Sequence, residues 1–429
     1  MTTRTRPKFA DPRVGDLAFW RASPEAREET IFAPLRATQP VSWHPPAEGT
    51  MPVLNPDEDG FWAITGYAEI GAVSKDPETF CSGKGMMYED FPPEAYEAMA
   101  SMLALDAPRH LKIRSLISSA FTPRRVKAIR EQIEAQSAAI VTDLLTSDSG
   151  ECDFVKHVSN RLPLWTISQM IGIPAEQRDE MLTNAEMING FQDPEINKGR
   201  DPAVVQFEAM TYLHRLAHQL ADERRAEPAD DLMTNLVEAE VDGEKLTDME
   251  IGSFLVLLCA AGTDTTRNTT SVAMQALCAH PDQKAALTAD LDDGLPAAIE
   301  EFLRWTSAVI TMRRTATRDV TLGGAPIVAG DKVILFYPSA NFDERVFDRP
   351  REFDITRHPN PHVAFGGGGP HYCLGAQLAR TQLRSIFTEL LTRVPDLEVG
   401  EPEYEMNTLI RAVKRLPCTF TPSARKATS

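Results

Sequence analysis

Apolar residues recur at three- and four-residue intervals through most of the chain between residues 108 and 305. The stretches RHLKIRSLISSAF, RVKAIREQIEAQSAAIVTDLLT and AVVQFEAMTYLHRLAHQLADERR show this spacing, which places apolar side chains on one face of an α-helix. Pieces typical of β-strands are short, and they are GFWAITGYAEI (60–70), VTLGGAPIV and DKVILFY. The pattern predicts a mainly α-helical fold with small β-sheets.

One predicted helix is much longer than the others. The residues T-D-M-E from Thr247 to Glu250 form a capping-box pattern, and the apolar spacing then continues to His280, where Pro281 ends it. About 30 residues at ~1.5 Å each give a helix of about 45 Å, enough to cross a domain. Because no linker rich in glycine, serine or proline interrupts the chain, we expect residues 1–429 to form a single domain.

Charge and cysteine usage exclude several classes of protein. The formal net charge is −18, from 44 basic and 62 acidic residues, whereas nucleic-acid binding needs a basic surface. The amino terminus has no apolar stretch of a secretory signal, and the run IGSFLVLLCAAG is too short to span a membrane. The six cysteines contain no CxxC pair and read as reduced thiols. We therefore expect a cytoplasmic protein without a membrane anchor.

The centre of the long helix contains residues that are unusual there. The segment AAGTDTT (260–266) is rich in glycine, threonine and aspartate, which weaken a helix interior. One interpretation is a tolerated kink or a close crossing of two helices. The other is a groove at Gly262, with Asp264 and Thr265 beside it as an acid and an alcohol that pass protons.

A second unusual segment is FGGGGPHYCLGAQLAR (365–380), in which a glycine-rich loop leads Cys373 into a helix. The helix amino terminus should favour the thiolate form of this cysteine. The segment lacks the GK[ST] of a phosphate loop, and no second sulfur stands at the spacing of a zinc site. His371 is poorly placed to act as a base for a nucleophilic cysteine. A single thiolate on haem iron fits best, because haem needs only one protein ligand of this kind.

Taken together, these segments resemble the cytochrome P450 superfamily of haem-thiolate monooxygenases, over essentially the whole chain. FGGGGPHYCLG resembles the haem-binding loop of that family. The resemblance implies haem b, with Cys373 as the axial thiolate and metal ligand. It also implies that His371 contacts a propionate and that Phe365 and Gly375 belong to the cofactor-binding loop.

Four further motifs match the family, and they occur in the family's order along the chain. AGTDTT resembles the oxygen-activation motif, which implies catalytic roles for Asp264 and Thr265. EFLR resembles the ExxR motif. RHLKIR and RTATRD resemble the segments that bind the haem propionates. The implied structural triad is Glu301, Arg304 and Arg357, and the implied propionate ligands are His110, Arg114 and Arg314.

The cysteine loop departs from the common family pattern by one residue. The extra residue falls among Gly366 to Gly369. Actinobacterial enzymes that oxidise sterol side chains and methyl-branched lipids share this longer loop. Three other segments are similar to the same subset, namely GFWAIT, DGEKLTD and SANFDERVFDRP. The resemblance thus implies a fold that is triangular and rich in helices, and oxidation at the end of an apolar, lipid-like chain.

The implied activity is insertion of one oxygen atom of O2 into an unactivated C–H bond. The residues expected to line the substrate pocket are Leu257, Ala261, Val309, Ile310, Met87 and Phe191. Alternatives are a terpene hydroxylase of the same superfamily, a peroxide-driven peroxygenase, and a haem-thiolate protein that binds a lipid or a gas without catalysis.

Electrons should come from another protein, because the chain has no flavin or nicotinamide fingerprint. The resemblance implies a ferredoxin and a ferredoxin reductase that draws on NAD(P)H. The basic segment TPRRVKAIR (122–130) is either a docking surface for an acidic ferredoxin or a solvated helix face. We expect a monomer.

Overall fold

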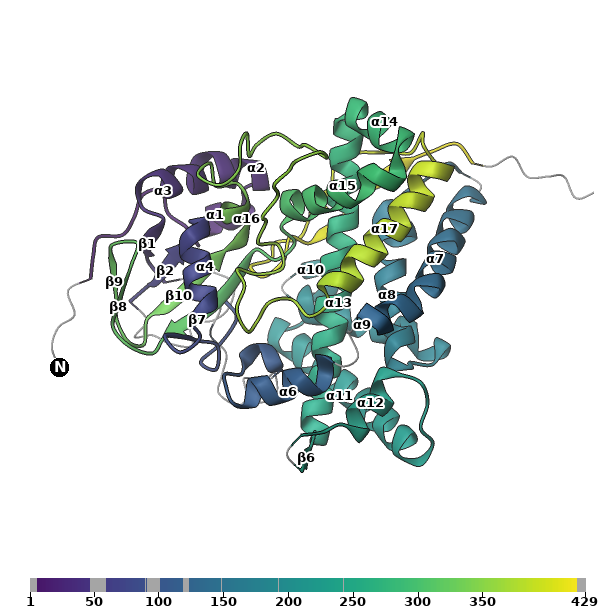
Figure 1. Cartoon of the computed structure of the whole chain (residues 1–429), viewed down its shortest axis with the longest axis horizontal. Helices are drawn as coiled ribbons and strands as arrows, with labels where there is room; N and C mark the ends of the chain where they lie inside the picture. The colour runs from purple at the N-terminus through teal and green to yellow at the C-terminus, as the bar shows by residue number, and fades with distance from the viewer. Residues whose placement is uncertain are drawn as a thin grey trace, which may run out of the picture.

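The computed structural model describes residues 6–46, 59–88, 90, 101–118, 123–147, 149–191, 193–241 and 243–422. Figure 1 shows a helical part gathered around one long helix, and beside it a smaller part that holds the main β-sheet and the amino-terminal helices. The outline is broad on one side and narrows on the other, so that it is roughly triangular. The predicted architecture, mainly α-helical with small sheets, is confirmed.

The helices divide between these two parts. The helical part contains α6 (Arg109–Ser118), α7 (Pro123–Leu145), α8 (Arg161–Ile171), α9 (Arg178–Asn189), α10 (Pro194–Asn197), α11 (Pro202–Ala226), α12 (Leu232–Glu238), α13 (Asp248–Ala279), α14 (Pro281–Ala289), α15 (Leu291–Thr306) and α17 (Ala376–Arg393). The sheet part contains α1 (Leu17–Arg21), α2 (Pro24–Arg27), α3 (Ala33–Thr38), α4 (Tyr67–Lys75) and α16 (Tyr337–Asn341).

Helix α13 is the long helix that the sequence predicts. The Thr247 side chain accepts a hydrogen bond from the Glu250 backbone, and the Glu250 carboxylate accepts one from the Thr247 backbone, which completes the capping box. The helix runs for 32 residues and ends just before His280 and Pro281. It packs against α8, α9, α11 and α15, so that most of its length is buried in the largest hydrophobic cluster.

The main sheet has five strands in the order β1 (Val41–His44), β2 (Phe61–Ile64), β10 (Lys332–Phe336), β7 (Thr311–Ala316) and β3 (Phe80–Cys81). Strand β10 runs parallel to β2, and the other pairs are antiparallel. The smaller sheets are β11 (Glu398–Val399) with β14 (Pro417–Thr419) and β4 (Glu151–Asp153), β12 (Glu403–Tyr404) with β13 (Val413–Arg415), β5 (Glu240–Val241) with β6 (Glu244–Lys245), and β8 (Val320–Leu322) with β9 (Ala325–Ile327).

The strand-like segment 60–70 is only partly a strand. Strand β2 ends at Ile64, and α4 begins at Tyr67 after Gly66. The apolar residues beyond the glycine, Ile70 and Val73, are three apart and face the core from a helix. The prediction of a single strand over this whole segment was therefore wrong in its second half.

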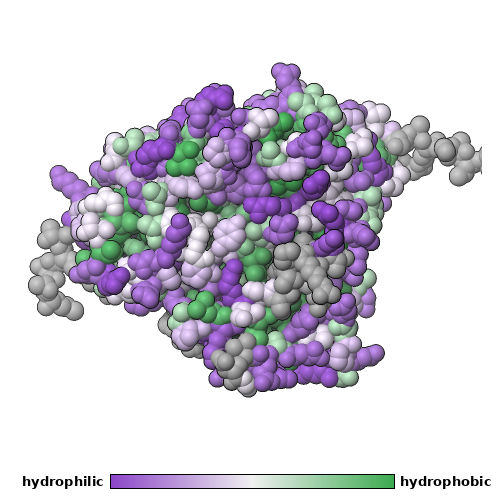
Figure 2. All heavy atoms as spheres, in the orientation of Figure 1, coloured by the Kyte–Doolittle hydropathy of each residue, from purple (hydrophilic) through white to green (hydrophobic). Residues whose placement is uncertain are grey.

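One face of the molecule is mostly polar. Hydrophilic side chains predominate on the face shown in Figure 2, in keeping with the net charge of −18. Among the described helices, none combines the length and the apolar character needed to cross a membrane.

Candidate active site

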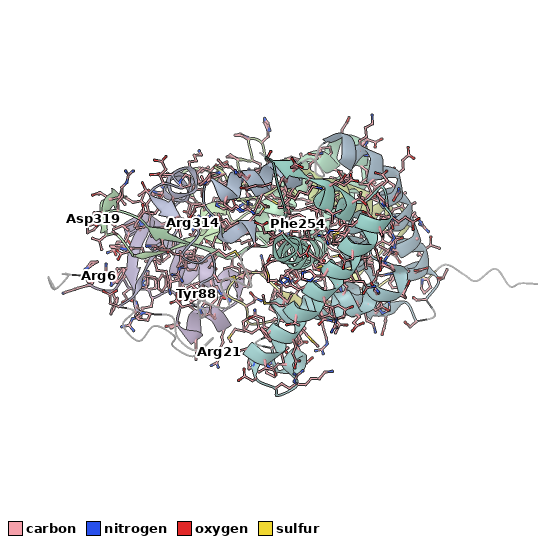
Figure 3. All side chains as sticks on the ribbon, turned by 90° about the horizontal axis from the view of Figure 1, so that it is seen from below. Arg6, Arg21, Tyr88, Phe254, Arg314 and Asp319 are labelled. Carbon is pink, nitrogen blue, oxygen red and sulfur yellow. The ribbon has the colours of Figure 1, made fainter. Side chains whose placement is uncertain are left out.

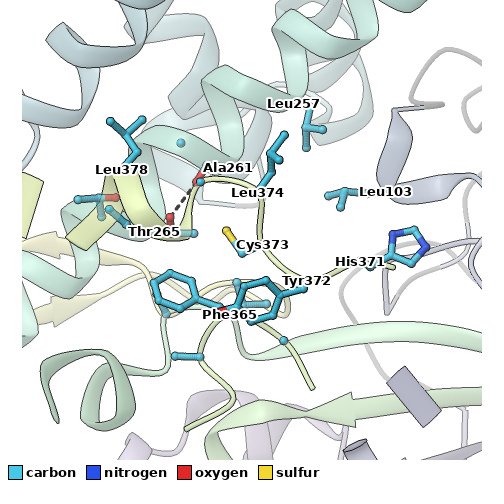
Figure 4. Close-up of a pocket in the computed structure, with 18 of the residues that line it drawn as sticks. Leu103, Leu257, Ala261, Thr265, Phe365, His371, Tyr372, Cys373, Leu374 and Leu378 are labelled. Carbon is cyan, nitrogen blue, oxygen red and sulfur yellow. Dashed lines mark hydrogen bonds between the residues drawn. The ribbon is translucent and has the colours of Figure 1, made fainter. Parts of the chain in front are cut away.

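A cavity lies where the helical part meets the main sheet. Figure 3 shows Arg314 on the sheet side of this junction and Phe254 on the helical side, and both residues line the cavity. The loop before α17 forms another wall, with Phe365, Cys373 and Leu374 facing the space (Figure 4). Most lining side chains are apolar, and no carboxylate lines this cavity in the described part of the chain.

The loop from Phe365 to Gly375 is a tight turn that depends on glycine. The Cys373 backbone N–H donates to the Phe365 carbonyl across 3.0 Å and closes the loop. Gly366, Gly368 and Gly369 have φ values of +99°, +94° and +74°, which residues with a side chain rarely adopt. The longer loop is therefore accommodated by three left-handed glycines.

Gly369 should tolerate no side chain. A Cβ atom at this position would lie 2.0 Å from the Ser74 carbonyl oxygen in α4, and its φ of +74° is strained for alanine. We expect Gly369→Ala to lower the free energy of unfolding by roughly 2–4 kcal/mol, from strain and overpacking together. Equilibrium urea unfolding measures this loss.

Gly324→Ala is the matched control, because Gly324 also has a positive φ of +81°, but a Cβ atom there would meet nothing within 4 Å. It should show the strain contribution alone, about 1–2 kcal/mol. Equal losses in the two variants would contradict the close contact between Gly369 and α4.

The Cys373 thiol is not turned into a thiolate by its position alone. Burial raises the pKa of Cys373, although the Gly375 N–H and the charges of Arg114 and Arg380 act in the opposite direction. The N–H group at the start of the helix thus favours the thiolate, as expected, but burial outweighs this effect in the protein without a metal. A metal ion would have to displace the proton, as it does for cysteine ligands generally.

Positively charged and imidazole side chains gather at one end of the cavity. Arg114 of α6, Arg314 of β7 and His371 of the loop all line it. The His110 ring lies against the His371 ring, with centroids 4.2 Å apart and the ring planes tilted by 40°. His110 and Arg114 come from the same face of α6 because they are four residues apart.

These groups fit an anionic ligand. Within the described residues, Nε2 of His110 and Nδ1 of His371 are buried without a hydrogen-bond partner, a costly arrangement unless a ligand supplies one. Burial, with Arg314 and His110 nearby, lowers the pKa of His371 to about 3. Among the described residues, no carboxylate lines the cavity to balance the charges of Arg114 and Arg314. The two propionates of a haem would supply two negative charges and the hydrogen-bond acceptors that these side chains need.

Helix α13 forms the wall opposite the cysteine loop. The Thr265 hydroxyl donates to the Ala261 carbonyl across 2.8 Å, as Figure 4 shows, and it lines the cavity. The helix continues without a break through this segment. At Gly262 a Cβ atom would meet the Ile167 side chain of α8 at 2.7 Å. The glycine thus serves a close helix crossing and also lines the cavity.

Asp264 does not lie beside Thr265 on this wall. Successive residues of a helix point about 100° apart, and the Asp264 side chain faces away from the cavity. It is only 3% exposed, it accepts a hydrogen bond from the Asn189 amide, and Oδ1 lies 3.3 Å from Nη2 of Arg267. The expectation that both members of the acid and alcohol pair share one groove was wrong.

Of the six expected substrate-pocket residues, the structure brings three to the cavity. Leu257, Ala261 and Val309 line it. Ile310 follows Val309 in extended chain, so that its side chain points to the opposite side and packs into the amino-terminal hydrophobic cluster. The prediction for Ile310 was therefore wrong.

Met87 and Phe191 are also buried elsewhere and are not among the lining residues. Met87 follows Met86, whose carbonyl accepts from Arg313 N across 2.9 Å, so this segment runs along β7. Phe191 lies just beyond α9, and its carbonyl accepts from the Asn197 amide. Resemblance to a family does not predict which way side chains point in such variable loops, because tertiary contacts decide it.

The expected triad is fully assembled. Glu301 and Arg304 are completely buried, with Glu301 Oε2 2.8 Å from Arg304 Nε and 3.2 Å from Arg357 Nε. Arg304 also donates to the carbonyls of Asn341 and Pro350. The triad thereby ties α15 to the long irregular segment that leads to the cysteine loop.

The structure also reveals a support for the cysteine loop that the sequence did not indicate. Arg380 of α17 forms an ion pair with Glu300 of α15, with Nε and Oε1 2.6 Å apart. The Arg380 guanidinium lies over the Phe365 ring, 4.6 Å from its centroid, and His362 Nε2 lies 3.0 Å from the same glutamate. Burial opposes ionisation of Glu300, but Arg380 and His362 outweigh it and lower the pKa to about 2.

Comparisons with known proteins agree with this geometry. A family model described as Cytochrome P450 matches residues 94–398. The methyl-branched lipid omega-hydroxylase of Mycobacterium tuberculosis is 39% identical over 96% of this chain and 95% of its own. The steroid C26-monooxygenase of Rhodococcus jostii is 37% identical over 91% of this chain and 81% of its own.

Solved structures give the same result. A cytochrome P450 of Mycobacterium marinum in complex with pseudoionone superimposes with a TM-score of 0.93 and 47% identity, over 97% of this chain and all of the other. A cytochrome P450 of Bacillus megaterium in complex with corticosterone gives 0.78 and 28%, over 92% of this chain and all of the other. With Cys373 facing a cavity that has a cationic end, the chain belongs to the cytochrome P450 family of haem-thiolate monooxygenases.

Proposed function

We propose that this monooxygenase hydroxylates the methyl-branched end of an apolar chain. The observation that carries the proposal is the lining of the cavity between α13 and Cys373. Leu257, Ala261 and Val309 face it together with Phe254 and Leu103, and the charged groups are confined to the end occupied by Arg114 and Arg314. Such a surface favours a hydrocarbon ligand, because a hydrocarbon gives up no hydrogen bonds to water when it is buried there.

Each residue around the cofactor has a role in this proposal. Cys373 would supply the thiolate ligand of a haem, and Arg114, Arg314, His371 and His110 would hold its propionates. Bound there, haem supplies the activation of O2, which a thiolate ligand favours by donating electron density. The protein orients the substrate and controls the access of water.

Thr265 and Asp264 supply the proton chemistry. The Thr265 hydroxyl lies on the cavity wall and can hold a proton at Oγ1 there. Asp264 lies buried on the other side of the same helix, and we assign it the role of passing protons toward Thr265. A protein that only binds a lipid or a gas needs no such pair, so their presence favours catalysis.

The substrate class follows from what the relatives and the ligand share. One relative is named for omega-hydroxylation of methyl-branched lipids, another for oxidation of steroid C26, and the Mycobacterium marinum protein was solved with pseudoionone. A methyl-branched chain, a steroid side chain and this acyclic ketone all end in a carbon with methyl substituents. An acyclic terpenoid is therefore the second candidate, favoured by the 47% identity to the pseudoionone complex.

Electrons reach the site from a redox partner, which we propose to be a ferredoxin served by a ferredoxin reductase. On α7 the side chains of Lys127 and Arg130 are accessible and can face an acidic protein. The side chains of Arg124 and Arg125, in the same basic segment, lie outside the described residues.

A ligand panel tests the substrate class. The purified haem protein is titrated with an iso-branched fatty acid, a straight-chain fatty acid of equal carbon number, a steroid with an intact side chain, and pseudoionone. We expect Soret shifts and turnover with the branched compounds and much weaker ones with the straight chain. Equal binding and equal turnover of the two fatty acids would contradict recognition of the branched end.

A further inference from the structure

A second cavity lies on the other side of α13, away from the haem-binding wall. Its volume is about 790 Å³, and charged and amide side chains from several separate elements line it. Asp264, Arg267, Glu186, Asn189 and Glu405 are among them. No three His, Cys, Asp or Glu side chains are placed to bind a metal ion in the part of the chain that the structure describes, so a metal does not explain this gathering of acids.

Helix α13 separates the two cavities, and two consecutive residues face them. Thr265 lines the haem-binding cavity, whereas Asp264 lines the second one. Asp264 is held by the Asn189 amide at Oδ2 and by Arg267 at Oδ1. Asp264 therefore faces the second cavity, while the next residue of the same helix faces the first.

Three carboxyl groups share the single guanidinium of Arg267. Asp264 Oδ1 lies 3.3 Å from Nη2, and Glu186 Oε1 lies 4.0 Å from Nη1. The Glu405 carboxyl interacts electrostatically with Arg267 and Asp264, and its Oε2 atom would lie 3.1 Å from a Cβ placed on Gly190, next to Asn189 in sequence. Asp264 is buried, whereas Glu186 and Glu405 are partly exposed. Because one guanidinium faces three carboxyl groups, their mutual repulsion favours a proton on one of them.

The surroundings single out Glu405 as that carboxyl. Burial raises the pKa of Glu186 as well, but its side chain is 39% exposed, and both Arg267 and the Asn160 amide, which donates to it across 3.2 Å, favour its ionised form. Burial, opposed by Arg267 and reinforced by Asp264, raises the pKa of Glu405 to about 7. At neutral pH this carboxyl therefore exists in both its protonated and its ionised form, as a proton donor must.

The remaining charges that face Glu405 come from two neighbouring elements. Lys414 of β13 lowers the pKa of Glu405, and Asp193, just before α10, raises it. These two residues pair with each other, with Nζ and Oδ2 2.9 Å apart. Their opposite effects leave the burial of Glu405 as the main influence.

We propose that the second cavity is the proton inlet of the reaction and that Glu405 recharges Asp264 with protons taken from it. The inference rests on the proposed monooxygenase function and deepens it, since hydroxylation consumes two protons and two electrons for each O2 as one oxygen atom enters the product and the other leaves as water. Glu405 acts through Asp264 and is a positioning residue rather than a catalytic one.

The transfer balances without a further reactant. The protonated Glu405 carboxyl releases its proton to water in the cavity, and the Asp264 carboxylate accepts one from the same water. Glu405 is then protonated again from bulk solvent through the open side of the cavity. Arg267 stays protonated throughout and keeps the Asp264 side chain in place between transfers.

The test uses the haem-loaded protein with its redox partners and an accepted substrate. Glu405→Gln keeps the shape of the side chain but cannot release a proton. We expect product formed per NAD(P)H consumed to fall on the order of tenfold, with more peroxide released and a larger solvent isotope effect. In the parent protein, product yield should fall as pH rises through about 7, and Glu405→Gln should lose this dependence.

Three further proteins make the result decisive. Asp179→Asn removes a carboxylate that lines the same cavity far from Arg267 in sequence and should behave as the parent, while Glu405→Asp should restore most of the coupling. Lys414→Gln removes a charge that lowers the pKa of Glu405 and should move the pH profile to higher pH. This last variant keeps the proposal testable if Glu405→Gln does not fold.

The failure of this inference is distinguishable from failure of the proposed function. An unchanged reduced carbon monoxide spectrum in every variant shows that the haem site is intact. If the parent protein hydroxylates its substrate and Glu405→Gln matches Asp179→Asn in coupling and pH profile, the proton inlet is overturned. If the parent protein forms no product from any branched compound, the proposed function fails first.

Discussion

Cys373→His is expected to abolish hydroxylation while leaving a protein that can still bind haem. The cysteine faces the cavity from the closed loop between Phe365 and Gly375. A thiolate on iron donates electron density that favours O–O cleavage, and a neutral imidazole does not replace it. We expect the reduced carbon monoxide complex to lose its strongly red-shifted Soret band and turnover to fall by about a thousandfold or more, as for removal of other essential groups.

The control is Cys278→Ser, because Cys278 lies at the end of α13 and contacts the Leu397 carbonyl, remote from the cavity. It should keep the band and the turnover. Retention of the red-shifted band in Cys373→His would mean that another cysteine ligates the iron, and the assignment of the loop would be wrong.

Glu301→Gln should cause the largest loss of stability. The Glu301 carboxylate is completely buried and accepts hydrogen bonds from Arg304, Arg357, Asn360 and the Asp354 backbone. The substitution removes the negative charge and leaves two buried guanidinium groups unbalanced. Breaking a buried ion pair from one side typically costs about 3–5 kcal/mol, so we expect a loss of that size in urea unfolding, with weakened haem retention.

Glu352→Gln is a suitable comparison, since Glu352 pairs with Arg349 on the surface. Exposed pairs contribute about 0–1 kcal/mol, and we expect no effect on haem retention. A similar small loss in both variants would show that the buried triad does not hold the segment before the cysteine loop.

Local signals predicted the parts of the fold that depend on neighbouring residues. The capping box at Thr247 and the proline at Pro281 mark the ends of α13, because both act within one helical turn. The glycines of the cysteine loop and the i,i+3 pair of Glu301 and Arg304 are equally local. Their order along the chain then made the family recognisable.

Features that depend on tertiary contacts could not be read in the same way. Asp264 and Thr265 are adjacent in sequence, yet the helical rotation between them places them in different cavities. Ile310 points away from the cavity because successive side chains of an extended chain lie on opposite sides. Glu405 and Arg267 line the same cavity only because the carboxy-terminal segment folds back on α9, where the Asn407 amide donates to the Asn189 carbonyl.

The most direct test of the central claim is the mass spectrum of the product that the protein forms from an iso-branched fatty acid under ¹⁸O2, with NAD(P)H and a ferredoxin system. The account predicts one ¹⁸O atom in each product molecule, bound to a carbon of the methyl-branched end. A product whose oxygen comes from water, or whose label lies in the middle of the chain, would contradict it.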